Sequence, residues 1–409
     1  MQISLKKSMI WNTAGNITYL IAQWLVTVFV TRIGGYDDAG ILSLAMSIAT
    51  FFSVITLSVR NYHVSDANDL YTSSDYVYHR ILMCGVSFIL CGIFVLVNSY
   101  DLITSLAIMA YMLVKLVEGF ADVLHGIAQK KWRLDIAGKS FVLRGALLLA
   151  SFLITMSITK NLSLAVFMMA VTTLLALLLY DFLSVKKIDS FKTVSSVSSA
   201  ISLSKVCLPM IAYGACINAI IPLAKYVLEI YHGNEVLGYY ASVATIAVLI
   251  QAFFSFVFTP LIGIFEDAYS KNDKKAILSL LLKLVVLLIG TTLIAFAAIA
   301  IAGEFAMTLV FGESIRDYVY LLYPTVIAST LTALVWLMGM LLVVMRDLKA
   351  LLIGAFLGFV TGAVLAIVLI PDMVYTGTNI AIIAALSLIV FIYCIKFVGF
   401  FFRKTSTRR

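Results

Sequence analysis

Ionisable side chains interrupt one long apolar stretch of the sequence, residues 102–127. Lys115, Glu118, Asp122 and His125 stand at offsets of 0, 3, 7 and 10, which places all four on one face of a helix. In a membrane each such charge costs roughly 2.5–3.5 kcal/mol near the bilayer centre, so it usually faces a protein interior or a watery cavity. Either the stripe faces a cavity, with Glu118 and Asp122 as ion-coupling sites or charge partners, or Lys115 and Glu118 neutralise each other. In the second case Asp122 and His125 are expected at the level of the lipid headgroups.

A second stripe lies on and just after the apolar stretch 206–228. Asn218, Pro222, Lys225 and Glu229 stand at offsets of 0, 4, 7 and 11, again on one helical face. Proline removes a backbone donor and favours a bend. A cation on a bent helix suits contact with a phosphate, whereas a lysine near the end of a span can also extend its ammonium to the headgroups. Lys225 is therefore a candidate anion-binding residue, and Asn218 a candidate cavity-lining residue.

Uncharged polar residues form a third stripe on the stretch 9–31. They are Asn12, Asn16, Tyr19 and Gln23. Such side chains either line a cavity or hydrogen-bond to a neighbouring helix.

Two arginines stand at or within the predicted ends of apolar stretches, Arg60 and Arg144. The planar guanidinium suits bidentate contact with phosphate. Most basic residues at such positions serve only topology and lipid contact. Arg60 and Arg144 are nevertheless candidates for binding an anionic substrate.

The elements that carry these residues are expected to be transmembrane helices. Hydrophobic residues make up 62% of the chain and charged residues only 12%, whereas a soluble fold uses roughly a quarter of its residues as charges. A helix of about 20 residues spans the hydrocarbon core. The sequence predicts an all-α membrane protein of about twelve transmembrane helices, at residues 9–31, 39–59, 80–98, 102–127, 140–158, 163–183, 206–228, 237–259, 276–302, 318–345, 350–370 and 378–402.

Basic residues are distributed unequally between the alternate connections. One set of connections and helix ends, from Lys6 to Arg409, holds 24 of the 29 lysines and arginines, and the other set holds only Arg32, Lys160 and Arg316. Cytoplasmic loops carry the basic excess. We therefore expect both termini in the cytoplasm, and we interpret the net charge of +8 as a topology signal rather than a nucleic-acid surface.

Sequence signals of enzymes and of cofactor sites do not occur in the chain. It has no Walker A motif, no HExxH motif and no Asp-x-Asp pair. The five cysteines lie inside apolar runs at spacings that match neither a disulfide framework nor a metal site. We expect a protein that is not an enzyme and has no metal or cofactor, with a proton or sodium ion as a possible coupling ion.

A short motif occurs twice, about half a chain apart. Residues 35–40 and 233–238 both fit Gly-x-acidic-x-x-Gly and both lead into a helix rich in small residues, at an offset of 198. The motif is either ordinary turn chemistry or the mark of a duplication into two parallel six-helix lobes around a central cavity. The second interpretation predicts an N-terminal lobe at 1–185, a cytoplasmic linker at 186–204 and a C-terminal lobe at 205–409.

Several of these segments together resemble a known family. They are Arg60–Asp66, Lys115–Gly145 and Leu208–Ala241. The chain resembles the polysaccharide-biosynthesis membrane proteins, the O-antigen-unit flippases of Wzx type. That family belongs to the superfamily of multidrug, oligosaccharidyl-lipid and polysaccharide exporters.

The resemblance implies a substrate and a site. The substrate would be an oligosaccharide on undecaprenyl pyrophosphate, moved from the cytoplasmic to the outer leaflet of the bacterial inner membrane by alternating access. Other polysaccharide-assembly proteins would be possible partners, and nucleic acid would not. The resemblance implies pyrophosphate-facing cations at Lys225, Arg60, Arg144 and Lys115, charge partners or ion-coupling sites at Glu118 and Asp122, and polar cavity residues at Asn12, Asn16, Gln23 and Asn218.

Other functions compete with this one. The strongest alternative is a cation-coupled exporter of small molecules from the same superfamily. A major-facilitator porter lacks support because the expected Gly- and Arg-rich loop is missing, and a membrane polymerase or ligase would need a large outer loop. A passive scramblase would differ only in its transport energetics.

Overall fold

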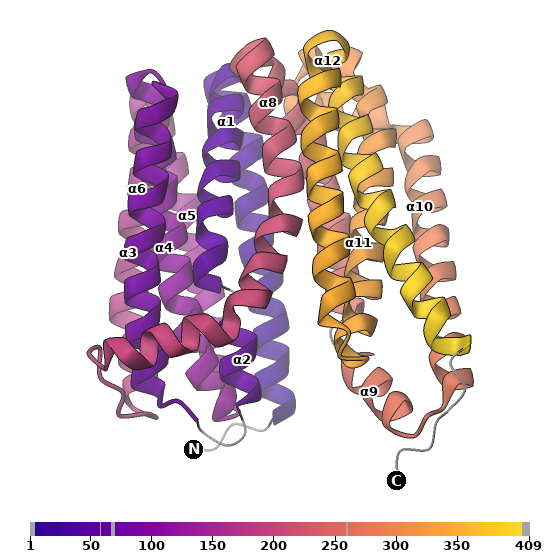
Figure 1. Cartoon of the computed structure of the whole chain (residues 1–409). Coiled ribbons are helices and arrows are strands. Elements are labelled where there is room, and N and C mark those ends of the chain that lie inside the picture. Colours follow the sequence, from indigo (N-terminus) through magenta and orange to yellow (C-terminus); the bar gives the residue numbers. More distant parts are fainter. Residues whose placement is uncertain (1–4, 58, 67–69, 259–260, 403–409) are drawn as a thin grey trace. The chain divides into compact units, whose positions relative to one another are not determined.

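The part of the chain that the structure describes is almost entirely helical. This computed structural model describes residues 5–57, 59–66, 70–258 and 261–402, and no strand occurs within these ranges (Figure 1). A helix satisfies its backbone polar groups internally, as hydrocarbon requires. The predicted all-α class is confirmed. The basic residues Arg403, Lys404, Arg408 and Arg409, which entered the topology prediction, lie outside the described residues, and the orientation of the termini stays a prediction.

The chain divides into two units, Met1–Asn218 and Ala219–Arg409. Unit 1 contains α1 (Leu5–Leu57), α2 (Arg60–Ser65), α3 (Ser73–Asn98), α4 (Leu102–Lys130), α5 (Leu134–Thr159), α6 (Leu162–Ala176), the π-helix η1 (Leu177–Phe182), α7 (Leu183–Lys186) and the first part of α8 (Val197–Phe258). Unit 2 contains the rest of α8, α9 (Ile262–Ser270), α10 (Lys274–Phe311), the 3₁₀-helix η3 (Glu313–Leu321), α11 (Leu322–Val344) and α12 (Leu348–Phe402).

Three of the helices are long enough to cross a membrane twice. Nine described helices have the length and composition of membrane spans, and α1, α8 and α12 contribute stretches of 51, 58 and 52 residues. Each of these is broken once, at Gly35, Gly233 and Val374 respectively. Counting the two arms of each as separate segments brings the described spans to the twelve that the sequence predicts.

The two glycine breaks have nearly the same backbone conformation. Gly35 has φ 87° and ψ −175°, and Gly233 has φ 83° and ψ 176°. Residues with a Cβ rarely adopt a positive φ of this kind, so glycine is needed at both turns. These are the first glycines of the two motifs that predict an internal repeat. The shared conformation at equivalent turns therefore supports that repeat.

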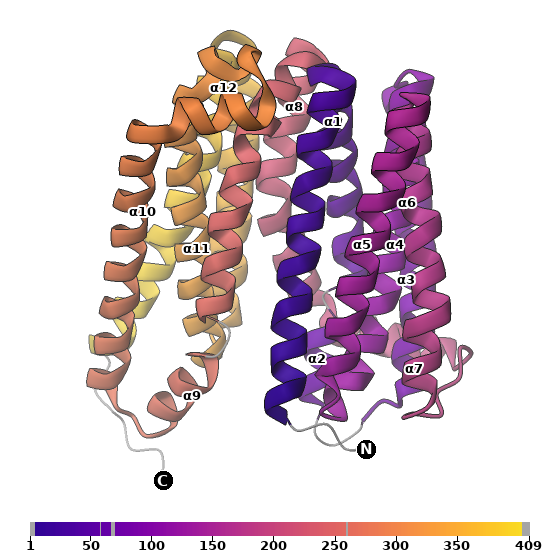
Figure 2. The same cartoon turned by 180° about the vertical axis from the view of Figure 1, so that it is seen from behind.

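Helices α1 and α5 pack closely through glycine. A Cβ on Gly15 would lie 2.1 Å from the carbonyl oxygen of Gly138, and a Cβ on Gly138 would lie 2.2 Å from that of Trp11. Figure 2 shows the two helices running side by side. Small residues let helix backbones approach in this way in membranes. The crossing brings the next turn of α1, with Tyr19, beside the turn of α5 that carries Arg144.

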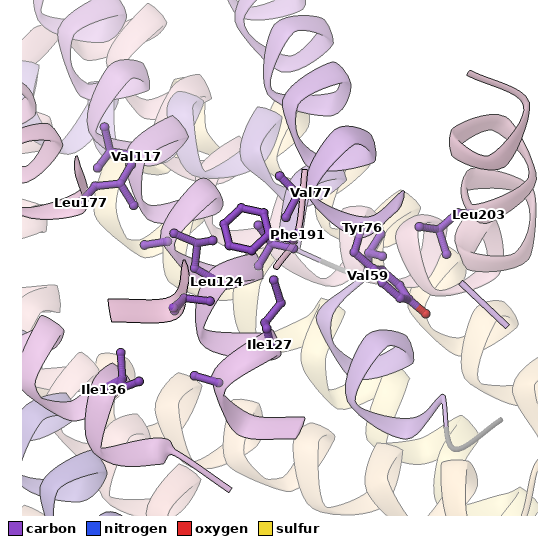
Figure 3. Packing of buried hydrophobic residues seen from close by; sticks show 14 of the residues in the cluster. Val59, Tyr76, Val77, Val117, Leu124, Ile127, Ile136, Leu177, Phe191 and Leu203 are labelled. Atoms are coloured by element: carbon purple, nitrogen blue, oxygen red, sulfur yellow. The ribbon is translucent and has the colours of Figure 1, made fainter. Parts of the chain in front are cut away.

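An apolar cluster at the α2 end of unit 1 holds α4 in place. Tyr76 and Val77 of α3 meet Leu124 and Ile127 of α4 there, and all four are almost completely buried (Figure 3). The first turns of α8 join the same cluster through the fully buried Leu203. Helix α4 therefore has two adjacent buried faces, one apolar and one carrying the charged stripe.

Unit 2 packs the two arms of α12 against each other through a stripe of glycines spaced four apart. A Cβ on Gly354 would lie 2.4 Å from the ring of Tyr393, and a Cβ on Gly358 would lie 2.3 Å from Ile389. The hydroxyl of Tyr393 donates to the carbonyl of Leu351 at 2.8 Å. Membrane helices pack through small residues in this way, because the hydrophobic effect does not drive helices together in lipid.

We expect Gly138→Ala to destabilise the protein by about 1–3 kcal/mol, because the added methyl group overlaps the backbone of α1. The measurement is the thermal unfolding midpoint of the detergent-purified chain. Gly85→Ala is the matched control, since nothing lies within 4 Å of its Cβ position and alanine favours a helix. Equal midpoints for the two variants would contradict the close α1–α5 crossing.

Candidate functional site

The charged stripe of α4 lies among two hydrogen-bonded polar groups inside unit 1, one around Asp122 and one around Glu118 and Asp181. Three carboxylates, Glu118, Asp122 and Asp181, each gather donors from other helices. We call the whole set the buried polar cluster; its members are Tyr19, Gln23, Arg60, Arg80, Lys115, Glu118, Asp122, His125, Gln129, Ser140, Arg144 and Asp181.

Glu118 joins α4 to α1. Its Oε2 lies 2.8 Å from Nζ of Lys115, and its Oε1 accepts hydrogen bonds from the Tyr19 hydroxyl and, at 3.1 Å, from Gln23 Nε2. The internal Lys115–Glu118 pair considered from the sequence is therefore present. It is not an isolated pair, because two donors from α1 share the same carboxylate.

Asp122 lies between two arginines from different helices. Its Oδ1 is 2.7 Å from Nη1 of Arg60 on α2, and its Oδ2 is 3.0 Å from Nη2 of Arg80 on α3. Arg60 also donates to Oε1 of Gln129 at 2.9 Å. The Arg80 side chain is only 1% exposed. Nothing in the local sequence around Arg80 shows that α3 faces Asp122, so Arg80 is not among the residues predicted from the sequence.

Asp181 is the third carboxylate, and it is not among the site residues predicted from the sequence. It lies on η1, a π-helix, a rare form that often marks functional positions. Its Oδ1 lies 2.9 Å from Nε2 of His125, and its Oδ2 accepts from the Ser140 hydroxyl at 2.8 Å. His125, which one interpretation of the sequence places at headgroup level, has a side chain that is 1% exposed and paired with Asp181, and its depth in the membrane stays a prediction. The position of Asp181 inside the predicted span 163–183 is the sequence feature that could have identified it as a candidate.

Among the described residues, Arg144 has no carboxylate within ion-pair distance. Its Nε donates to Ser140 Oγ at 3.1 Å, and its guanidinium carbon lies 5.5 Å and 5.3 Å from the ring centroids of Tyr19 and Phe141. The residue is 2% exposed. Within the described part of the chain, Nη1 of Arg144 is buried and has no hydrogen-bond acceptor.

A cavity of about 140 Å³ opens beside Arg144. It is lined by Tyr19, Glu118, Asp122, His125, Phe141 and Arg144. Three of the four stripe residues, Glu118, Asp122 and His125, therefore line this cavity, and a role of the stripe in ion coupling stays a prediction.

His63, one turn along α2 from Arg60, adds no charge to this region at neutral pH. Burial, together with the nearby positive charges of Lys130 and Arg80, lowers the pKa of His63 to about 4. Its ring stacks on Tyr76 with the centroids 3.9 Å apart. The positive charge of the cluster therefore comes from lysine and arginine.

The remaining candidate residues lie elsewhere. Asn16 donates to the backbone and side-chain oxygens of Asn12 at 2.8 and 3.4 Å, so these two bond within α1. Asn218 is exposed and donates to the carbonyl of Gly214. Lys225 belongs to unit 2, where it is half-buried on α8. The structure thus brings together Arg60, Lys115, Glu118, Asp122, Arg144 and Gln23, and their roles in transport stay predictions.

No group of three or more His, Cys, Asp or Glu side chains is placed to hold a metal ion in the described ranges.

Comparison with known proteins places the chain among membrane transporters in fold. No family model matches the sequence. The chain is 24% identical over 301 residues to the capsular polysaccharide biosynthesis protein CapF of Staphylococcus aureus, covering 73% of this chain and 75% of CapF. This similarity confirms the predicted resemblance to polysaccharide-biosynthesis membrane proteins.

Two solved structures share the fold over nearly the whole chain. The lipid II flippase MurJ in an inward closed conformation matches with a TM-score of 0.73 and 11% identity, over 95% of this chain and 87% of MurJ. A multidrug resistance MATE family transporter of the MOP superfamily, in an inward-facing conformation, matches with a TM-score of 0.72 and 14% identity, over 98% and 100%. The chain is a multi-pass membrane protein with the two-lobed fold of these transporters.

We expect Asp122→Asn to destabilise the protein by about 3–5 kcal/mol, because the buried Arg80 loses its carboxylate. Adding Arg80→Met should recover part of the loss, since an apolar side chain needs no counter-charge. The thermal unfolding midpoint in detergent measures both. The control is Asp267→Asn, which breaks an exposed pair with Lys271 and should change stability by less than about 0.5 kcal/mol. An unchanged midpoint for Asp122→Asn would refute the double ion pair.

Proposed function

We propose that this protein is a flippase that carries an oligosaccharide linked to undecaprenyl pyrophosphate from the cytoplasmic to the outer leaflet of the bacterial inner membrane. The observation that carries the proposal is the similarity to CapF, a capsular polysaccharide biosynthesis protein, over 73% of the chain. The fold shared with the lipid II flippase MurJ supports it. Alternating access of the two lobes would move the headgroup.

A cargo with a charged headgroup needs a protein that offers charged and polar partners inside the membrane. A pyrophosphate and its sugars cannot enter hydrocarbon unless their charges and hydroxyls find partners. The polyprenyl tail can remain in lipid while the headgroup passes along protein. Basic side chains within the membrane, such as Lys115 and Arg144 in unit 1 and Lys225 in unit 2, supply positive charge that an exporter of cations would not need.

Among the cations implied by the resemblance, Lys225 is the best first test for contact with the pyrophosphate. Arg60 and Lys115 are engaged by Asp122 and Glu118, and replacing them would disturb the buried polar cluster itself. Lys225 is not a member of that cluster. Its replacement therefore leaves the ion pairs of Asp122 and Glu118 in place.

Export of small molecules coupled to a cation is the second candidate, favoured by the likeness to the MATE family transporter. Glu118 and Asp122 would then be the coupling sites for a proton or sodium ion. Both carboxylates are engaged by lysine or arginine in this structure, so coupling would require these ion pairs to open during the transport cycle.

In a strain that lacks its own flippase and makes a matching glycan, we expect expression of this protein to restore surface polysaccharide. Lys225→Ala should lower the restored amount by about tenfold or more, because a charge-assisted contact with the pyrophosphate is lost. Immunoblotting of extracted polysaccharide measures the effect at matched protein levels.

Lys271→Ala is the matched control, since Lys271 is 68% exposed and forms an exposed ion pair with Asp267; it should restore polysaccharide fully. Absence of restoration despite good expression, together with efflux of cationic dyes, would replace the flippase proposal by small-molecule export.

A further inference from the structure

The first turns of α8 form an amphipathic segment at the α2 end of unit 1. The helix begins at Val197, inside the stretch 186–204 that is predicted from the sequence to be a cytoplasmic linker. Figure 1 shows this part of α8 lying across the neighbouring helices of unit 1, before α8 turns to run along them. We call residues 197–208 the transverse segment.

One face of the transverse segment is fixed against unit 1. Ala200, Leu203 and Cys207 are at most 2% exposed, and Leu203 and Cys207 belong to the apolar cluster of this unit. Ser204 Oγ also lies 2.9 Å from Nε2 of His79 on α3. Because packing and hydrogen bonding hold the segment at one rotation, its other side chains point in defined directions.

A second face of the segment is apolar and exposed. Val197, Ile201 and Leu208 stand at offsets of 0, 4 and 11, which places them on one side of the helix, and they are 53%, 51% and 60% exposed. Ser198 and Lys205 are exposed on the adjacent side. Exposed apolar side chains beside a polar, basic face are typical of helices that lie in the membrane interface.

Lysines surround the segment. Residues 186–205 contain four lysines and a single carboxylate, and that carboxylate, Asp189, lies 3.3 Å from Nζ of Lys131. The four lysines are all exposed; they are Lys186, Lys187, Lys192 and Lys205. Clusters of about four or more basic residues on an amphipathic helix or beside a membrane span attract anionic lipid headgroups. The apolar face favours a lipid over a soluble anion, because only a lipid offers acyl chains together with a phosphate.

We propose that the transverse segment lies in the membrane interface and binds anionic phospholipid. Val197, Ile201 and Leu208 enter the boundary between headgroups and acyl chains, and Lys192 and Lys205 contact the lipid phosphates. The same helix continues from this segment into unit 2, so bound lipid anchors the connection between the two units. The inference goes beyond the proposed function and does not depend on which cargo the protein moves.

Fluorescence quenching of introduced tryptophans tests where the segment lies. Ile201→Trp and Ser198→Trp are made separately in the full-length protein, which is reconstituted in nanodiscs that contain phosphatidylcholine and phosphatidylglycerol. The signal of the unaltered protein, with its four tryptophans, is subtracted. We expect lipids with brominated acyl chains to quench the tryptophan at position 201 severalfold more strongly than that at position 198. Aqueous iodide should show the reverse order.

Brominated lipids of different headgroup test the selectivity. At equal mole fraction, brominated phosphatidylglycerol should quench the tryptophan at position 201 severalfold more than brominated phosphatidylcholine does. Adding Lys192→Gln and Lys205→Gln should lower this preference by about fivefold for each lysine removed. Adding Lys271→Gln instead, which alters an exposed lysine of unit 2, should leave the preference unchanged and is the matched control.

Stronger quenching by iodide at position 201 than at position 198 overturns the proposal, because the apolar face then lies in water. Equal quenching by the two brominated lipids overturns the binding of anionic lipid, and so does a preference that survives the double lysine replacement. If Ile201→Trp does not fold, Val197→Trp takes its place on the same face. None of these measurements involves transport, so a failure of the flippase proposal leaves the result intact.

Discussion

The polar interior of unit 1 depends on the ion pairs of Asp122 with Arg60 and Arg80. Arg80 is almost fully buried, and a buried charge that loses its partner destabilises a protein by about 3–5 kcal/mol. The three residues come from α4, α2 and α3, so the pairing also fixes how these helices are rotated against one another. One turn along α4 in either direction, Glu118 and His125 extend the same arrangement to α1 and η1.

Two backbone features make the rest of this arrangement possible. The contact between Gly15 and Gly138 lets α1 approach α5 closely enough for Tyr19 to lie against Arg144. The π-helix η1 carries Asp181 to a fully buried position between His125 and Ser140. Neither feature is itself charged. Both determine which charged side chains lie within contact distance, so the ion pairs and hydrogen bonds of the cluster depend on how the helices pack.

Occupied carboxylates limit what the cluster can do in transport. Glu118 and Asp122 each have a cationic partner within 3.0 Å, and a role in ion coupling would need those pairs to separate. Arg144 differs, because its partners are a hydroxyl and two aromatic rings. The cluster therefore combines carboxylates paired with lysine or arginine and one arginine that is linked to the carboxylate of Asp181 only through the Ser140 hydroxyl.

Local features of the sequence determined the class of fold, the twelve apolar segments, the stripe from Lys115 to His125 on one face of α4, and the turns at Gly35 and Gly233. Hydrophobic length, helical periodicity and the need for glycine at positive φ all act within a few turns, which is why they can be read along the chain. The tertiary structure alone decided that Arg80, Ser140 and Asp181 belong to the cluster and that His125 is buried. Arg80 and Asp122 are 42 positions apart, and His125 and Asp181 are 56 apart. Which helices become neighbours, and how each is rotated, follows from packing between distant segments, and no local pattern contains that information.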